Sequence, residues 1–191
     1  MDRETRLFLI RHAPVAGSVG VIHDPEAPAD TGDVAAIGWL RAQLPADKIA
    51  ICSPARRTRD TAAALGLDPV REAAFREQAF GAWTGRRHAE LAAEYGDAYK
   101  NFWLEPAGNR PPGGESFVDQ IARVEHALAA LPQGDVALVV HSGTIRAVLA
   151  IALDLPPDRA LSFVIDPWSL TRIDRLANGW RIVAVNHTRP A

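Results

Sequence analysis

Short apolar runs alternate along the chain with segments of helical periodicity. The runs lie at residues 7–10, 49–52 and 136–140, and each has the length of a strand buried on both faces. Helices are predicted at residues 34–44, 57–65, 115–131 and 144–153. In the clearest of them, Phe117, Ile121, Val124, Leu128 and Leu131 keep the three- and four-residue spacing of one helical face. This alternation predicts an α/β fold, a three-layer αβα sandwich with a mainly parallel central sheet.

Two segments depart from the alternation. Residues 169–176 and 180–185 flank Asn178-Gly179, a dipeptide typical of a tight turn, and they predict a terminal hairpin. Residues 83–116 contain two tryptophans and a Pro-Gly cluster but no clear strand. We interpret residues 83–116 as a small cap or lid inserted into a single domain that spans residues 1–191.

Composition supports a single globular domain. The chain has 191 residues, 48% of them hydrophobic, and 21 basic against 23 acidic side chains give a formal charge of −2. This balance argues against a nucleic-acid partner, and no apolar run reaches the roughly 20 residues that span a bilayer. The charged N-terminus does not resemble a signal peptide, so a cytoplasmic location without membrane attachment is expected. The lone Cys52 excludes an intramolecular disulfide and disfavours a thiolate metal site.

Two of the six histidines lie where ligands bind in α/β proteins. His12 follows the first predicted strand, and His141 follows the strand at residues 136–140. The crevice beyond the carboxyl ends of parallel strands is the usual ligand site. The two histidines are therefore predicted to share one pocket, although two capping histidines that never meet are the alternative.

The residues around these histidines favour an anionic ligand. Arg11 precedes His12, and Ser142-Gly143 begins a helix whose backbone N–H groups would face the ligand. The second predicted strand likewise ends shortly before Arg57, at the start of another helix. This combination suits a dianionic phosphate. Metal chelation by the two histidines is the weaker alternative, because zinc or iron would need a further acidic or imidazole ligand.

Five stretches of the chain resemble, in order, the motifs of the histidine phosphatase superfamily, the phosphoglycerate-mutase-like proteins. They are Leu9-Ile10-Arg11-His12, Ser53-Pro54-Ala55-Arg56-Arg57-Thr58-Arg59-Asp60-Thr61-Ala62, Glu77-Gln78-Ala79-Phe80-Gly81-Ala82-Trp83-Thr84-Gly85, Gly113-Gly114-Glu115-Ser116 and Val140-His141-Ser142-Gly143-Thr144-Ile145-Arg146. Each motif alone is weak, and their shared order over residues 7–146 makes the resemblance specific.

The resemblance implies a phosphoglycerate-mutase-like fold and a catalytic set. His12 would be the nucleophile that becomes phosphohistidine, and Glu77 would protonate the leaving alcohol. Arg11, Arg57 and His141 would bind the phosphate. No metal ion and no cofactor is implied, since the arginines would offset the negative charge of the transferred phosphoryl group.

Further substrate contacts are expected from Ser142 and Ser18. Ser142 is predicted to donate through its backbone rather than to act as a nucleophile, and Ser18 takes a position where the family often has asparagine. Ala13-Pro14-Val15 depart from the glycine, acidic or amide residue and threonine or serine that usually follow the nucleophile. An inactive relative is therefore an alternative.

A phosphatase is preferred over a mutase. Gln78 stands where the phosphoglycerate mutases have an arginine, and the chain lacks room for their larger insertion. The motifs around Phe80 and Glu115 are similar to the branch that includes alpha-ribazole phosphatase. We therefore predict metal-independent hydrolysis of a small phosphorylated metabolite, with alpha-ribazole 5′-phosphate as one candidate. A mutase, a non-catalytic phosphate-binding module and a metallohydrolase remain alternatives, and the sequence leaves open whether the protein forms a homodimer.

Overall fold

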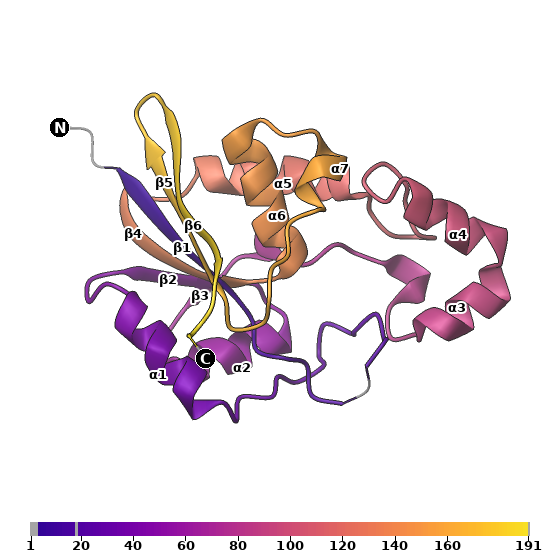
Figure 1. The fold of residues 1–191 in the computed structure, drawn as a ribbon, viewed down its shortest axis with the longest axis horizontal. Coiled ribbons are helices and arrows are strands. Elements are labelled where there is room, and N and C mark those ends of the chain that lie inside the picture. Colours follow the sequence, from indigo (N-terminus) through magenta and orange to yellow (C-terminus); the bar gives the residue numbers. More distant parts are fainter. Residues whose placement is uncertain (1–3, 18, 191) are drawn as a thin grey trace.

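A computed structural model describes residues 4–17 and 19–190 as a six-stranded open sheet with helices on both faces (Figure 1). The strands are β1 (Thr5–Arg11), β2 (Ile49–Cys52), β3 (Val70–Arg71), β4 (Gly134–Val140), β5 (Leu170–Leu176) and β6 (Gly179–His187). The helices are α1 (Val34–Gln43), α2 (Arg56–Ala64), α3 (His88–Tyr95), α4 (Asp97–Leu104), α5 (Phe117–Ala129), α6 (Ser142–Leu153) and α7 (Pro157–Ala160), with short 3₁₀ turns at η1 (Ala73–Phe75) and η2 (Gly81–Trp83).

The sheet is mainly parallel, as the alternation predicts. Its strand order is β3-β2-β4-β1-β5-β6, and β1 to β4 run parallel to one another. The predicted terminal hairpin adds the antiparallel strands β5 and β6. The two-residue strand β3 is absent from the prediction, because its exposed residues, Val70 and Arg71, form no apolar run.

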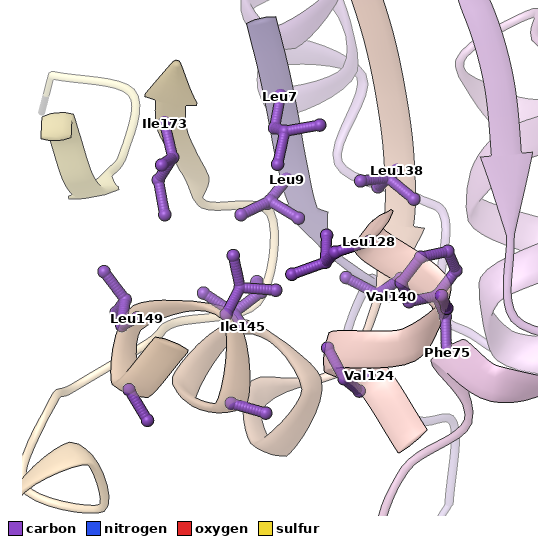
Figure 2. Close-up of a cluster of buried hydrophobic side chains, with 14 of the residues drawn as sticks. Leu7, Leu9, Phe75, Val124, Leu128, Leu138, Val140, Ile145, Leu149 and Ile173 are labelled. Carbon is purple, nitrogen blue, oxygen red and sulfur yellow. The ribbon is translucent and has the colours of Figure 1, made fainter. Parts of the chain in front are cut away.

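Alternate side chains of β1 are buried on opposite faces of the sheet. Leu7 and Leu9 pack with residues of α5 and α6, and part of this cluster is visible in Figure 2. Phe8 and Ile10 belong to a second cluster, which includes Leu40 of α1. Burial on both faces explains why this strand is a continuous apolar run, and it confirms the predicted three-layer arrangement.

The helix predicted at residues 115–131 begins at Phe117, because Ser116 caps it. The Ser116 hydroxyl oxygen accepts a hydrogen bond from the Asp119 backbone N–H at 3.1 Å, and the Asp119 carboxylate accepts one from the Ser116 N–H at 2.8 Å. This reciprocal capping satisfies backbone donors at the helix start. It also aligns the helix so that Gln120 and Val124 face the interior, where both are fully buried.

Residues 83–116 contain α3 and α4, which lie apart from the sheet (Figure 1). They share a small apolar core of their own, centred on Trp83, Leu91, Tyr99 and Phe102. The segment is joined to the loop after β1, since the Ile22 N–H donates to the Arg86 carbonyl at 3.0 Å. That this insertion acts as a lid stays a prediction.

No helix within the described residues, 4–17 and 19–190, is long and apolar enough to cross a membrane.

Candidate active site

His12 and His141 meet at the carboxyl ends of β1 and β4. The backbone N–H of His12 donates to the Val140 carbonyl at 3.0 Å. The two imidazole rings lie 5.1 Å apart between centroids, with an angle of 68° between their planes. The alternative of two histidines that never meet is therefore wrong. Adjacent parallel strands bring together two residues that are 129 positions apart in the sequence.

His12 is held as a neutral imidazole with one defined tautomer. Its Nδ1 lies 2.6 Å from the Ala13 carbonyl oxygen, which can only accept, so Nδ1 carries the proton. Burial lowers the pKa of His12 well below its usual 6.5, and His141, Arg57 and Arg11 lower it further. The unprotonated Nε2 accepts a hydrogen bond from Arg57 Nε at 3.3 Å, and its lone pair is the nucleophilic position of the ring.

His141 presents an unpartnered nitrogen. Its Nε2 lies 2.8 Å from the Ser53 hydroxyl at the end of β2, whereas its buried Nδ1 has no hydrogen-bond partner among the described residues. Burial lowers the pKa of His141 well below 6.5, and the nearby arginines add to that effect. Because His141 lines the same cavity as His12, its Nδ1 is a candidate hydrogen-bonding group for a phosphate oxygen.

Arg11, Arg57 and Arg146 form the cationic part of this cavity. Burial lowers the pKa of each guanidinium, and Glu77 raises it in every case, although an arginine remains charged at neutral pH. Backbone carbonyls fix their orientation: Arg57 donates to Asp24 at 3.1 Å, and Arg146 donates through Nε to Phe163 at 2.9 Å. Three arginines against one glutamate give this part of the cavity a positive charge in either protonation state of Glu77, which suits an anionic phosphate.

Glu77 faces this cavity from the segment between η1 and η2, and four donors hold its carboxylate. Its Oε2 accepts from the Gly143 N–H at 3.2 Å and from the Ser142 hydroxyl at 3.4 Å. Its Oε1 accepts from the Gln78 N–H at 3.1 Å and from Gln120 Nε2 at 3.2 Å. The approach to α6 requires a glycine, because a Cβ on residue 143 would lie 2.1 Å from Glu77 Oε1.

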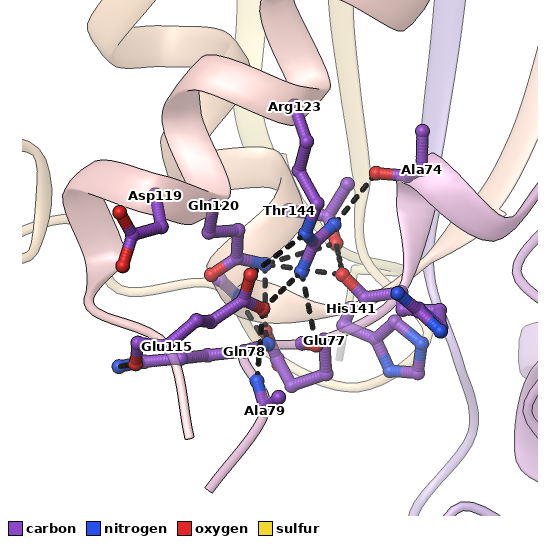
Figure 3. A network of polar contacts seen from close by, with 12 residues as sticks. Ala74, Glu77, Gln78, Ala79, Glu115, Asp119, Gln120, Arg123, His141 and Thr144 are labelled. Carbon is purple, nitrogen blue, oxygen red and sulfur yellow. Dashed lines mark hydrogen bonds and ion pairs between the residues drawn. The ribbon is translucent and has the colours of Figure 1, made fainter. Parts of the chain in front are cut away.

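A network of buried and partly buried polar groups on and just before α5 supports Glu77 (Figure 3). Arg123 donates to both carboxylate oxygens of Glu115, at 2.6 and 3.1 Å, and to the Glu77 carbonyl at 3.1 Å. Gln120, fully buried, also donates to the Arg76 carbonyl at 3.2 Å. These contacts hold the Glu77 segment against α5, so that its carboxylate stays at the cavity.

Sequence reasoning missed Arg146, Gln120 and Arg123 as members of the site. Arg146 is the last residue of the motif that begins at Val140, and it lies one helical turn beyond Ser142. This position was the available sequence signal for Arg146. Gln120 and Arg123 lie on the long predicted helix, and a buried amide within an apolar face was the available signal for Gln120.

The two further predicted contacts and the four other histidines lie as follows. Ser18 lies outside the described residues, and the Ser142 hydroxyl contacts Glu77, so both predicted substrate contacts stay predictions. His23, His88 and Trp103 line the cavity. The exposed side chains His126 and His187 are absent from its lining.

The cavity has a volume of about 1070 Å³. Within residues 4–17 and 19–190, no group of three or more histidine, cysteine or acidic side chains is placed to hold a metal ion. The donor set at His12 and His141 is instead two imidazoles among three arginines, and cations of this kind attract an anion.

We expect the stability of the protein to fall between pH 7 and pH 5 because of His12 and His141. Well above pH 6.5 both are neutral in the folded and the unfolded state, so they contribute no pH dependence there. Below pH 6.5 the unfolded chain takes up protons that the folded protein resists. Each histidine should then lower the free energy of unfolding by up to about 2 kcal/mol by pH 5.

Urea unfolding at several pH values in phosphate-free buffer measures this effect. His12→Asn should show a shallower decline than the wild type, whereas His126→Asn, a change at an exposed position on α5, should leave the slope unchanged. An identical slope in His12→Asn and the wild type would contradict the assignment.

The topology of the sheet and a cationic site suited to phosphate together define the class of protein. The sequence profile of the histidine phosphatase superfamily (branch 1) matches residues 7–188, so the chain belongs to this superfamily, as its motifs predict. It is 32% identical over 177 residues to the glucosyl-3-phosphoglycerate phosphatase of Mycobacterium tuberculosis, which covers 81% of this chain and 78% of that protein. It is 25% identical over 197 residues to the adenosylcobalamin/alpha-ribazole phosphatase of Salmonella typhimurium, which covers 96% of both chains.

Other relatives place limits on this comparison. The chain spans about half the length of the first curated relatives it matches. One of them is a bifunctional protein of Mycobacterium tuberculosis, which is 31% identical over 191 residues. That match covers 92% of this chain and 51% of that protein. The crystal structure of the alpha-ribazole phosphatase from Shigella flexneri superimposes with a TM-score of 0.83 over 97% of this chain and 99% of that one, at 22% identity. That match establishes the shared fold.

Proposed function

We propose that this protein is a metal-independent phosphomonoester phosphatase that acts through a phosphohistidine at His12. One observation carries the proposal: a buried, neutral imidazole has its Nε2 in the part of the cavity that Arg11, Arg57 and Arg146 line together with Glu77. A neutral nucleophile next to fixed positive charge is what phosphoryl transfer to a side chain requires.

In the first step, His12 Nε2 attacks the phosphorus atom of the bound monoester. A nitrogen–phosphorus bond forms while the bond from phosphorus to the ester oxygen breaks. Arg11 and Arg57 offset the charge on the phosphoryl oxygens, and His141 Nδ1 supplies a further hydrogen bond. Glu77 in its protonated form gives its proton to the departing alcohol oxygen.

In the second step, water replaces the alcohol. The Glu77 carboxylate takes a proton from the water molecule, whose oxygen attacks the phosphorus atom of the phosphohistidine. The nitrogen–phosphorus bond breaks, inorganic phosphate leaves, and His12 and Glu77 return to their starting protonation states. One residue therefore serves as acid and then as base.

The residue at position 78 favours a phosphatase over a phosphoglycerate-type mutase. Gln78 is neutral, and its side-chain amide donates to the Glu115 carbonyl at 2.8 Å. It supplies no cation for a substrate carboxylate. The names of the relatives in M. tuberculosis and S. typhimurium also point to hydrolysis, with alpha-ribazole 5′-phosphate and glucosyl-3-phosphoglycerate as candidate substrates.

Hydrolysis of p-nitrophenyl phosphate with and without EDTA tests the proposal. We expect turnover that resists the chelator, together with a phosphoprotein, trapped by rapid quenching, that is labile in acid and stable in base. Loss of turnover with EDTA would favour a metallohydrolase. Phosphate binding without turnover across a panel of phosphomonoesters would favour a non-catalytic module.

A further inference from the structure

The cavity extends well beyond the phosphate-binding residues, toward the insertion that contains α3 and α4. Its volume of about 1070 Å³ is slightly larger than the range, about 300–1,000 Å³, of pockets that enclose a drug-sized ligand. A phosphoryl group at His12 would occupy a small part of this space. The rest is available to the alcohol portion of the ester.

This outer part is lined by apolar side chains, most of them from two segments. The loop after β1 contributes Val19 and Ile22, and the insertion contributes Phe102, Trp103 and Pro106; Phe80, just before the insertion, adds a further ring. Trp103 is 44% exposed and Val19 is 92% exposed. Exposed apolar groups within a concave site are typical of a surface that a ligand covers.

The ring of Trp103 is held in place by its neighbours. It packs edge-on against Phe102, with centroids 4.9 Å apart and planes at 89°, and it contacts His88 at 5.9 Å. Phe102 is buried in the core of the insertion, so it anchors Trp103 on α4. A rigid aromatic surface binds a flat ring at little cost in conformational entropy.

Charge is concentrated at the opposite end of the cavity. Arg11, Arg57 and Arg146 interact electrostatically with Glu77 near His12. Among the described lining residues, the charged groups elsewhere are Glu26, which pairs with Arg59 at 2.8 Å, and the exposed Arg76. Burial and the charge of Arg57 lower the pKa of His23, which favours its neutral form. A second anionic group on the substrate would therefore meet little buried positive charge.

We propose that the residues around Trp103 form a leaving-group subsite for alcohols with a flat aromatic body and no second anionic group. The inference rests on the proposed phosphatase activity and narrows its substrate class. Between the two compounds that the relatives' names suggest, it favours the nucleoside phosphate, which carries an aromatic base, over the glycerate ester, which carries a carboxylate.

Three esters of primary alcohols test the subsite, because their leaving groups need similar protonation by Glu77. They are 2-naphthylmethyl phosphate, ethyl phosphate and 3-phosphoglycerate. We expect kcat/KM for the naphthylmethyl ester to exceed the other two by at least about tenfold. Trp103→Ala should lower it by about tenfold and change the value for ethyl phosphate by less than about twofold, whereas Trp103→Phe should retain part of the preference.

Leu104→Ala is the matched control, since Leu104 is the next residue of α4, is 77% exposed and is absent from the cavity lining. It should leave all three values unchanged. An equal loss for all three esters in Trp103→Ala would overturn the subsite and assign Trp103 a structural role. A preference for 3-phosphoglycerate that Arg76→Gln abolishes would overturn it in favour of a second anion site.

Binding of 2-naphthylmethylphosphonate, which cannot be hydrolysed, separates this inference from the proposed activity. Calorimetry should show a Kd about tenfold weaker in Trp103→Ala, with the Kd of inorganic phosphate unchanged. If the wild type binds the phosphonate in this way but hydrolyses none of the esters, the proposed function fails while the subsite stands. If the substitution leaves the Kd of the phosphonate unchanged, the subsite is wrong even where the esters are hydrolysed.

Discussion

Replacing His12 by alanine is expected to lower kcat/KM for p-nitrophenyl phosphate by about 10⁴-fold or more. The substitution removes the atom that would form the covalent bond to phosphorus, and loss of a nucleophile is among the largest single-residue effects in enzymes. Steady-state assays on the purified variant measure this loss. The arginine cluster would remain, so phosphate should still bind to His12→Ala.

His126→Ala is the matched control for this variant, because His126 is exposed on α5 and does not line the cavity. Its activity should equal that of the wild type. The quench experiment supplies a second readout, since His12→Ala should yield no acid-labile phosphoprotein. A variant that retains more than about a tenth of the wild-type rate would rule out His12 as the nucleophile.

Glu77→Gln is expected to separate the two chemical steps. The amide has the shape of the carboxylate and loses the hydrogen bonds that one of its two oxygens accepts, and it neither donates a proton to the leaving oxygen nor accepts one from water. For an alkyl ester such as ethyl phosphate, kcat should fall by about 10²- to 10⁴-fold, which is the usual contribution of general acid–base catalysis. For p-nitrophenyl phosphate the first step should be less affected, because p-nitrophenolate leaves without a proton.

Stopped-flow assays of Glu77→Gln should therefore show a burst of about one p-nitrophenol per protein. Slow turnover should follow, because hydrolysis of the phosphohistidine becomes rate-limiting. Glu125→Gln, a change at an exposed glutamate on α5, should behave as the wild type. Equal losses for the alkyl and the aryl ester, without a burst, would argue that Glu77 holds the site together and transfers no proton.

The sequence by itself was sufficient for the layered fold and for the meeting of His12 and His141. A strand buried on both faces is a short apolar run, so the runs at residues 7–10 and 136–140 could be recognised as strands. Parallel strands place their carboxyl ends at one edge of the sheet, which brings the two histidines together. The order of five motifs then identified the superfamily. Short-range hydrophobic patterns predict the strands and helices because backbone geometry fixes which face of an element each residue occupies.

Only the tertiary structure decided how the site is supported and how far it extends. Glu77 meets Gly143 although 66 residues separate them, and Gln120 and Arg123 reach the Glu77 segment from a helix whose spacing indicated a core role. The apolar surface at Trp103 likewise depends on the packing of α4 against the rest of the insertion. Such contacts depend on the relative placement of whole elements, and residue spacing within one element does not encode that placement.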